Sequence, residues 1–135
     1  ASVRNNLHAK ASADEDSISK LLSIPDFCRK YFKEIARQGG CPILNTAVEA
    51  DDNQPLLKKK VNDTIARWTK NIEMTIKQGM VRGEIKSNVD PRTYASLIIA
   101  LFEGGILLSK STNELRYLHD CMDRIETIIR KELKR

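Results

Sequence analysis

The sequence predicts an all-α fold, an antiparallel helical bundle. Only 6 Gly and 4 Pro occur among 135 residues, aromatic residues make up 5%, and hydrophobic residues make up 41%. The hydrophobic residues are mostly Leu, Ile, Ala and Val, and they recur at steps of three and four over long stretches. This composition and this period are typical of helices packed on helices, and the length fits one domain.

Charge and cysteine content limit the classes of protein. The formal net charge of +5 comes from Lys and Arg spread along the chain, which solvated helix faces explain better than a nucleic-acid-binding surface does. Cys28, Cys41 and Cys121 have neither the spacing of a disulfide framework nor that of a zinc site, which favours a reducing compartment. Because no signal peptide or anchoring motif is present, we expect a cytoplasmic protein with no membrane partner.

We expect residues 1–11 to be a flexible lead-in, since they are polar and aperiodic, and residues 12–135 to form one helical domain. Ser12 and Glu15 have the spacing of a capping box. In this motif the serine oxygen accepts a hydrogen bond from a free backbone amide, and the glutamate side chain accepts one from the backbone amide of the serine. This pattern predicts a short first helix that ends near Leu22.

The second expected helix begins around Pro25 and ends near Gln38. Proline is tolerated in the first turn of a helix, and Asp26 suits the positive end of the helix dipole. Gly39 and Gly40 then end the helix, because glycine readily adopts the left-handed conformation that follows a last turn.

Two more helices begin at prolines. Pro42 opens a short one that runs to about Ala50, and Pro55 opens the longest one, which ends in a turn at Gly79 and Gly83. A stripe at helical spacing runs along this long helix: Leu57, Val61, Ile65, Trp68, Ile72 and Ile76.

Residues 95–108 are apolar on every side of a helical wheel apart from Ser96 and Glu103, in a helix capped by Asp90. A helix that is apolar all round has to be covered all round. The stretch is shorter than the roughly 18 apolar residues that indicate a membrane span, so protein must cover it, from this chain or from a second copy. We therefore expect an oligomer.

A last helix is predicted from a second capping box, Ser111 to Glu114, toward Arg135. Its apolar residues have the spacing of a coiled-coil seam, so the last two helices are expected to form a four-helix dimer interface with a second copy. The alternative is that both helices are buried in a monomeric core. The expected homodimer interface comprises Leu97, Leu101, Gly105, Leu108, Leu118, Met122, Ile125 and Ile129.

Residues 39–52, the long helix with Trp68, and the pair Glu103-Gly104 near the end of the apolar helix resemble the C-terminal regulatory domain of TetR (tetracycline-repressor-like) transcriptional regulators. The likeness covers about residues 20–130. It implies an all-helical domain whose last two helices dimerise and whose preceding helices enclose a pocket for a small inducer. It further implies that the protein is a repressor, in which the inducer alters DNA binding by an N-terminal helix-turn-helix head.

Such a head needs about 45 to 50 residues with two short helices. The residues before Ser12 are too few to hold it, so we expect DNA to be a partner only through a head domain that is not present in this chain.

The expected ligand is a small apolar or amphipathic inducer, because ligand sites are mainly apolar with a few polar groups. Tyr31 and Trp68 are favoured because each brings a polar atom that needs a partner. The alternative is a helical dimerisation or protein-interaction module with no small-molecule ligand, in which the same residues are ordinary core. The candidate ligand-binding residues are Phe27, Tyr31, Leu44, Val48, Trp68, Ile72, Ile98 and Phe102.

Two further residues carry chemistry that needs an explanation. A carboxylate at Glu103 must be paired, protonated or at a water-filled edge. One reading is that it contacts a cationic ligand or a basic side chain. The other is that it reaches the rim of its helix. Cys41 stands at a helix start, where its thiolate would be stabilised for sensing oxidants, or else it is a small buried hydrophobe.

Catalytic and metal-binding signatures are missing from the sequence. There is no Gly-x-Ser-x-Gly elbow, no phosphate-binding glycine loop and no His-Glu-x-x-His. His8 and His119 have no Cys, His or carboxylate at ligand spacing other than Asp120, which neighbours His119. We therefore expect no enzyme activity, no cofactor and no metal.

Overall fold

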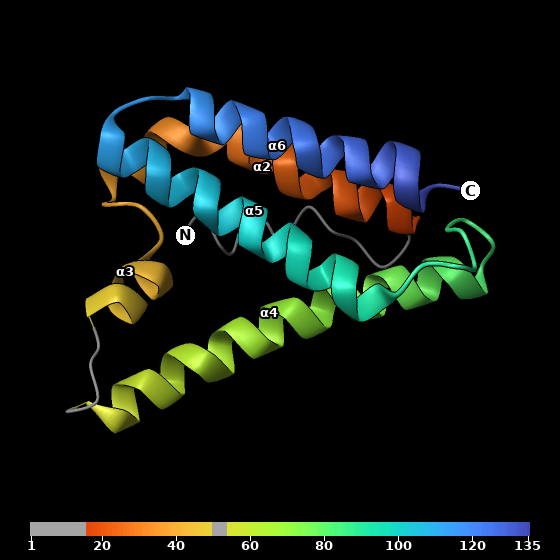
Figure 1. Ribbon diagram of the computed structural model, residues 1–135, viewed down its shortest axis with the longest axis horizontal. Helices are drawn as coiled ribbons and strands as arrows, with labels where there is room; N and C mark the ends of the chain where they lie inside the picture. The colour runs from red at the N-terminus through yellow and green to blue at the C-terminus, as the bar shows by residue number, and fades with distance from the viewer. Residues whose placement is uncertain (1–15, 50–53) are drawn as a thin grey trace.

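The computed structural model describes residues 16–49 and 54–135, without the side chains of Leu44 and Val48. These residues form an all-α bundle (Figure 1), as predicted. The helices are α2 (Ser17–Arg37), α3 (Pro42–Glu49), α4 (Pro55–Val81), α5 (Pro91–Thr112), α6 (Arg116–Thr127) and the π-helix η1 (Ile128–Leu133). The lead-in and the first capping box lie outside the described residues.

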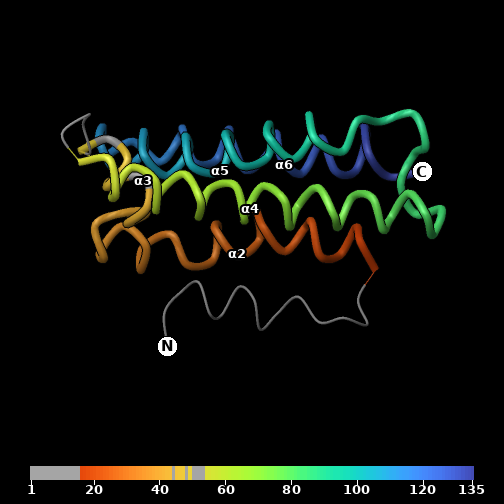
Figure 2. The backbone as a smooth tube through the Cα atoms, turned by 90° about the horizontal axis from the view of Figure 1, so that it is seen from below, coloured from red at the N-terminus to blue at the C-terminus, as the bar shows by residue number. Residues whose placement is uncertain are grey.

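The helices pack around α5, which contacts α6, α4 and α2. Helices α2 and α6 lie side by side, whereas α4 meets α5 at one end and diverges from it at the other (Figure 1). Helix α3 lies near the diverging end and packs against α4, as the backbone trace in Figure 2 also shows. The bundle therefore has a closed end and an open end.

Helix α2 runs without a break through Pro25, so the restart predicted there is wrong. A proline inside a helix costs about 3 kcal/mol or more. Continuing the helix buries Leu21, Phe27 and Phe32 on one side, and each such side chain contributes about 1.5 to 3 kcal/mol. The cap is Asp16, whose Oδ1 accepts from Ser19 N at 2.7 Å.

The closed end is held by a tight corner at residues 82–86. Gly79 is not a helix stop but a buried position of α4, where an added Cβ would lie 2.5 Å from Ile85 Cδ1. Gly83, with φ of 75°, makes the turn as predicted. The backbone of Lys86 donates to Leu133 O at 2.8 Å, so the last turn of the chain packs on this corner.

The capping of α5 follows the prediction, and that of α6 does not. Asp90 Oδ1 accepts from Arg92 N at 3.1 Å at the start of α5. Helix α5 continues through Ser111, which is therefore not a cap. Instead the hydroxyl of Ser109 accepts from Leu118 N at 2.9 Å, so a side chain of the preceding helix satisfies a free amide in the first turn of α6.

Five of the eight residues of the predicted dimer interface lie inside the single chain. Leu118, Met122, Ile125 and Ile129 are 0–1% exposed in one hydrophobic core with α2, α4 and α5. Side chains enclosed by their own chain are not available to a second copy, so any dimer contact would have to use other residues. Gly105 is also buried, with Cys121 Cβ 3.0 Å from the position of an added Cβ.

Part of α5 remains at the surface. Leu97 is 46% exposed, Leu108 is 42% exposed, and Leu101 is half-buried. By length and composition alone α5 is also apolar enough to cross a membrane, a property common to core helices of bundles. Here it packs on three other helices, so its inner side is core, whereas no other described helix covers its outer side.

Candidate functional site

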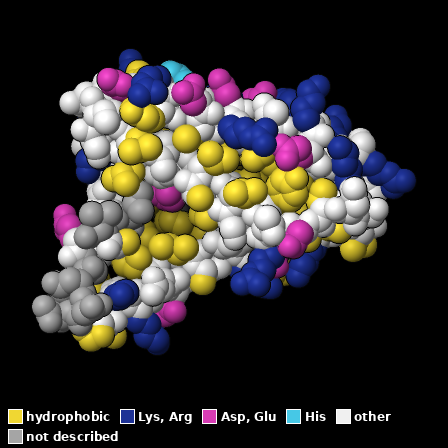
Figure 3. All heavy atoms as spheres, viewed as in Figure 1, with side chains coloured by type: hydrophobic (Ala, Val, Ile, Leu, Met, Phe, Trp, Pro, Cys, Tyr) yellow, Lys and Arg dark blue, Asp and Glu magenta, His cyan; other side chains and the backbone are white. Residues whose placement is uncertain are grey.

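A hollow opens between α3, α4 and α5, where α4 diverges from the rest of the bundle. Figure 3 shows hydrophobic side chains inside this hollow and an acidic side chain at its edge. Sites for small molecules are concave and mainly apolar with a few polar groups. The hollow is therefore the part of the molecule that we take as the candidate site.

Glu103, in the middle of α5, is the polar group of this region. The thiol of Cys41, just before α3, donates to Glu103 Oε1 with the sulfur and oxygen 3.5 Å apart. Glu103 Oε2 is buried and has no hydrogen-bond partner among the described residues. Burial raises the pKa of Glu103, and the hydrogen bond from Cys41 lowers it by less. Glu103 as a whole is half-buried, with one carboxylate oxygen accepting from Cys41 and the other enclosed by the chain.

Cys28 on α2 is close enough to this carboxyl group to be influenced by its charge. Its side chain is fully buried, and burial, followed by the charge of Glu103, raises its pKa to about 12. A thiol in this state is neutral and unreactive at physiological pH. No disulfide joins Cys28, Cys41 and Cys121, all of which lie within the described residues. Cys28 is not among the residues predicted for the site, although its position next to Phe27 on the buried side of α2 was an available signal.

The predicted ligand-binding residues divide into two groups. Phe27, Ile72 and Ile98 are 4%, 9% and 0% exposed and belong to the packed core. Tyr31, Trp68 and Phe102 are half-buried, on three different helices. The Tyr31 ring stacks on Phe27 with centroids 4.8 Å apart.

The side chains of Leu44 and Val48 lie outside the described part of the structure. The half-buried aromatic residues therefore remain the best candidates for contact with a ligand.

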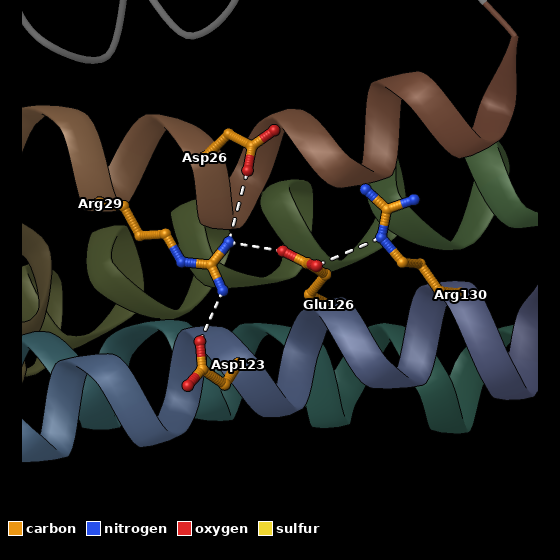
Figure 4. Close-up of polar contacts among 5 residues, drawn as sticks. All are labelled: Asp26, Arg29, Asp123, Glu126 and Arg130. Atoms are coloured by element: carbon orange, nitrogen blue, oxygen red, sulfur yellow. Dashed lines mark hydrogen bonds and ion pairs between the residues drawn. The ribbon is translucent and has the colours of Figure 1, made fainter.

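A second polar constellation joins α2 to α6 (Figure 4). Arg29 Nη1 lies 2.7 Å from Glu126 Oε1, and Arg29 Nη2 lies 2.7 Å from Asp123 Oδ1. Asp26 contacts the same guanidinium at 3.4 Å, and Arg130 contacts Glu126 at 3.2 Å. The hydrogen bond from Arg29 is the main cause that lowers the pKa of Glu126. All its charges are paired, so the cluster fastens two helices together.

The uncovered side of α5 forms a continuous apolar surface. Leu97, Leu101, Gly104 and Leu108 recur at steps of three and four, which places them on one face; we call them the α5 stripe. An added Cβ at Gly104 would have no atom within 4 Å among the described residues. A glycine inside a helix costs about 1 kcal/mol relative to alanine, and no described residue uses the space that Gly104 leaves.

Comparison with known proteins bears on this arrangement. Residues 17–125 match the family described as tetracyclin repressor-like, C-terminal domain. A TetR transcriptional regulator from Chloroflexus aurantiacus J-10-fl has a similar structure, with a TM-score of 0.84 and 30% identity, over 98% of this chain and 67% of that one. A TetR-family transcriptional regulator from Cytophaga hutchinsonii gives a TM-score of 0.79 and 30% identity, over 98% and 66%.

No curated protein matches the chain by sequence. The chain spans about two thirds of the length of the two solved regulators. The family match covers most of the chain, and both structures share its helical bundle. The chain belongs to the tetracyclin repressor-like C-terminal domain family of TetR regulators.

Proposed function

We propose that this chain is the effector-sensing and dimerisation domain of a cytoplasmic TetR-type repressor, and that a small apolar or amphipathic inducer binds in the hollow between α3, α4 and α5. One observation carries the proposal: Glu103 Oε2 is buried without a hydrogen-bond partner among the described residues, and Glu103 joins α5 to Cys41, just before α3, where these two helices border the hollow. Buried polar atoms almost always have a hydrogen-bond partner. An atom left without one, in a domain of a regulator family, is where a ligand would supply the partner.

The packing of α4 could transmit ligand binding in the hollow to other parts of a regulator. Helix α4 borders the hollow at one end, and at the other end Gly79 lies against Ser17, the first residue of α2. A ligand that moves α4 would therefore shift the point where the chain enters the domain. Allosteric control needs two sites and a coupling between them. We propose that the second site is a DNA-binding head outside this chain.

The α5 stripe supports the dimerisation half of the proposal. An exposed apolar surface on a small domain commonly marks a protein–protein contact, and the open space above Gly104 lets a second helix come close. The interface that we propose is therefore centred on Leu97, Leu101, Gly104 and Leu108, in place of the buried residues of α6.

Native mass spectrometry of the purified chain tests both halves. We expect the mass of a dimer, carrying a co-purified small molecule or gaining one from a panel of hydrophobic metabolites. Trp68→Ala, at the half-buried side of α4, should weaken retention of that molecule. Met74→Ala is the matched control on the same helix, where the side chain is 49% exposed. A dimer that retains no molecule would favour the ligand-free dimerisation module. A monomer would contradict the dimer interface that we propose at the α5 stripe.

A further inference from the structure

The unpartnered oxygen of Glu103 also restricts the chemistry of the ligand. Three partners could satisfy it: a proton on the carboxyl group itself, a neutral hydrogen-bond donor, or a cation. A neutral donor leaves a buried negative charge uncompensated, which is costly away from water. A cation compensates the charge and supplies the hydrogen bond together, so it stabilises the ionised carboxylate most.

The charged groups on the surrounding helices do not supply that cation within the described residues. On α2, Arg29 forms ion pairs with Asp123 and Glu126. Lys30 lies over the Tyr31 ring, with its Nζ 5.3 Å from the ring centroid. On α4, Lys70 and Lys77 both contact Glu73.

On α5, Lys110 lies against Gly40, with Nζ 3.7 Å from the position of an added Cβ. It stands seven residues after Glu103, which is about 10 Å along the helix. The neighbouring Cys41 and Cys28 are thiols, and burial and the charge of Glu103 keep Cys28 neutral. The positive charge is thus left for the ligand to bring.

Half-buried aromatic side chains elsewhere in the bundle suit the same ligand. Tyr31, Trp68 and Phe102 are half-buried on α2, α4 and α5. Aromatic rings attract ammonium groups through their negative faces, and they also cover an apolar body. A carboxylate combined with aromatic rings is therefore a setting for a molecule that is apolar but carries one positive charge.

We propose that the inducer is a lipophilic amine, whose ammonium group pairs with Glu103 while its hydrocarbon body lies in the hollow. This inference rests on the proposed ligand-binding function and narrows it to one chemical class. It also predicts that ligand binding depends on pH, because the ligand and a proton compete for Glu103. In the free domain a proton competes for Glu103, since burial raises its pKa. Binding of an ammonium ion displaces that proton, so affinity rises with pH through the raised pKa.

The test compares three probes of equal chain length: octylammonium, 1-octanol and octanoate. Isothermal titration calorimetry on the full chain should show octylammonium binding at least about tenfold more tightly than 1-octanol, with octanoate weakest, because a buried charge pair is worth more than a neutral contact. Glu103→Gln keeps the shape of the side chain and should remove the preference for the amine. Glu114→Gln, at an exposed acid paired with Arg116, should leave it unchanged.

Each result separates the two proposals. Equal affinity for amine and alcohol, or tighter binding of octanoate, overturns the cationic class and leaves the hollow as a ligand site. A preference that survives in Glu103→Gln overturns the role of Glu103. Binding of none of the three probes overturns both the class and the proposed sensing function. Release of a proton on binding, measured in two buffers of different ionisation enthalpy, supports the displacement at Glu103.

Discussion

Arg29 on α2 and Glu126 on α6 stand 97 residues apart in the chain, yet their side chains meet at 2.7 Å. The same guanidinium also contacts Asp123, so one side chain fastens the first described helix to the last α-helix (Figure 4). Isolated surface pairs contribute little. Here one partly buried Arg makes two short contacts in a network, which is the arrangement that does contribute.

Replacing Arg29 with Ala should lower the free energy of unfolding by about 1 to 2 kcal/mol, because Glu126 and Asp123 lose a charged hydrogen-bond donor. Urea denaturation followed by circular dichroism measures this. Arg37→Ala is the control: Arg37 pairs only within α2, with Glu34, and its side chain is 76% exposed. The Arg37→Ala substitution should lower the free energy of unfolding by no more than about 0.5 kcal/mol. Equal costs for the two variants would contradict the fastening role of Arg29.

Glu103→Gln should change how stability depends on pH. Burial raises the folded pKa of Glu103 above its ordinary value of 4.5. Between these two pKa values the folded chain holds a proton that the unfolded chain has lost, so wild-type stability falls as pH rises through this window. Glutamine cannot ionise, so the variant should gain stability relative to wild type with rising pH and match it most closely in acid.

Urea unfolding of the ligand-free chain between about pH 4 and pH 8 provides the measurement. Glu114→Gln serves as the exposed control and should shift little across the series. A difference between Glu103→Gln and wild type that stays constant with pH would show that Glu103 ionises normally in the folded chain.

Leu108→Glu should dissociate the dimer that we propose through the α5 stripe. Leu108 is 42% exposed in the single chain, so the substitution leaves the core in place. In an apolar interface, however, it would bury an unpaired charge on each side. Sedimentation equilibrium should give half the wild-type mass.

Val81→Glu is the matched control, since Val81 is 88% exposed at the end of α4 and lies off the stripe. It should keep the wild-type mass. If Leu108→Glu and Leu97→Glu both sediment like wild type, the interface lies elsewhere.

Gly79→Ala should destabilise the closed end of the bundle by about 1 to 3 kcal/mol, the usual cost of an added methyl group in a packed core. The new Cβ would lie 2.5 Å from Ile85 Cδ1 and 2.9 Å from Ser17 Cβ, so the corner and the start of α2 would both have to move. Urea unfolding tests this against Gln78→Ala, at an exposed neighbour in the same helix. A neutral or stabilising Gly79→Ala would show that the corner is loosely packed.

Sequence patterns predicted the helices well where the signal is local. The stops at Gly39 and Gly83 and the cap at Asp90 depend on residues next to each other, and all three are present. The break at Pro25 was wrong because the gain from burying one side of a continuous α2 exceeds the local cost of a proline. Ser109 as the cap of α6 depends on how two helices pack, which no local pattern contains.

The periodic stripe of α6 also shows that a local pattern predicts burial but not the packing partner. Spacing correctly marked Leu118, Met122 and Ile125 as a buried set, but it could not tell which chain covers them, and their own chain does. Glu103 stood out as a charge in an apolar helix, whereas its contact with Cys41 spans 62 residues and emerges only from the fold.

The corner at residues 82–86 has one more consequence. Glu84 accepts from Ser17 N through its side chain at 3.0 Å and from Arg135 N through its backbone at 3.1 Å, so the start of the first described helix and the end of the chain are tied to one turn. Helix ends usually fray independently. Here a protease cut or a loop insertion at Glu84 would loosen both ends together, while the same change in the exposed residues 55–60 of α4 would leave both in place.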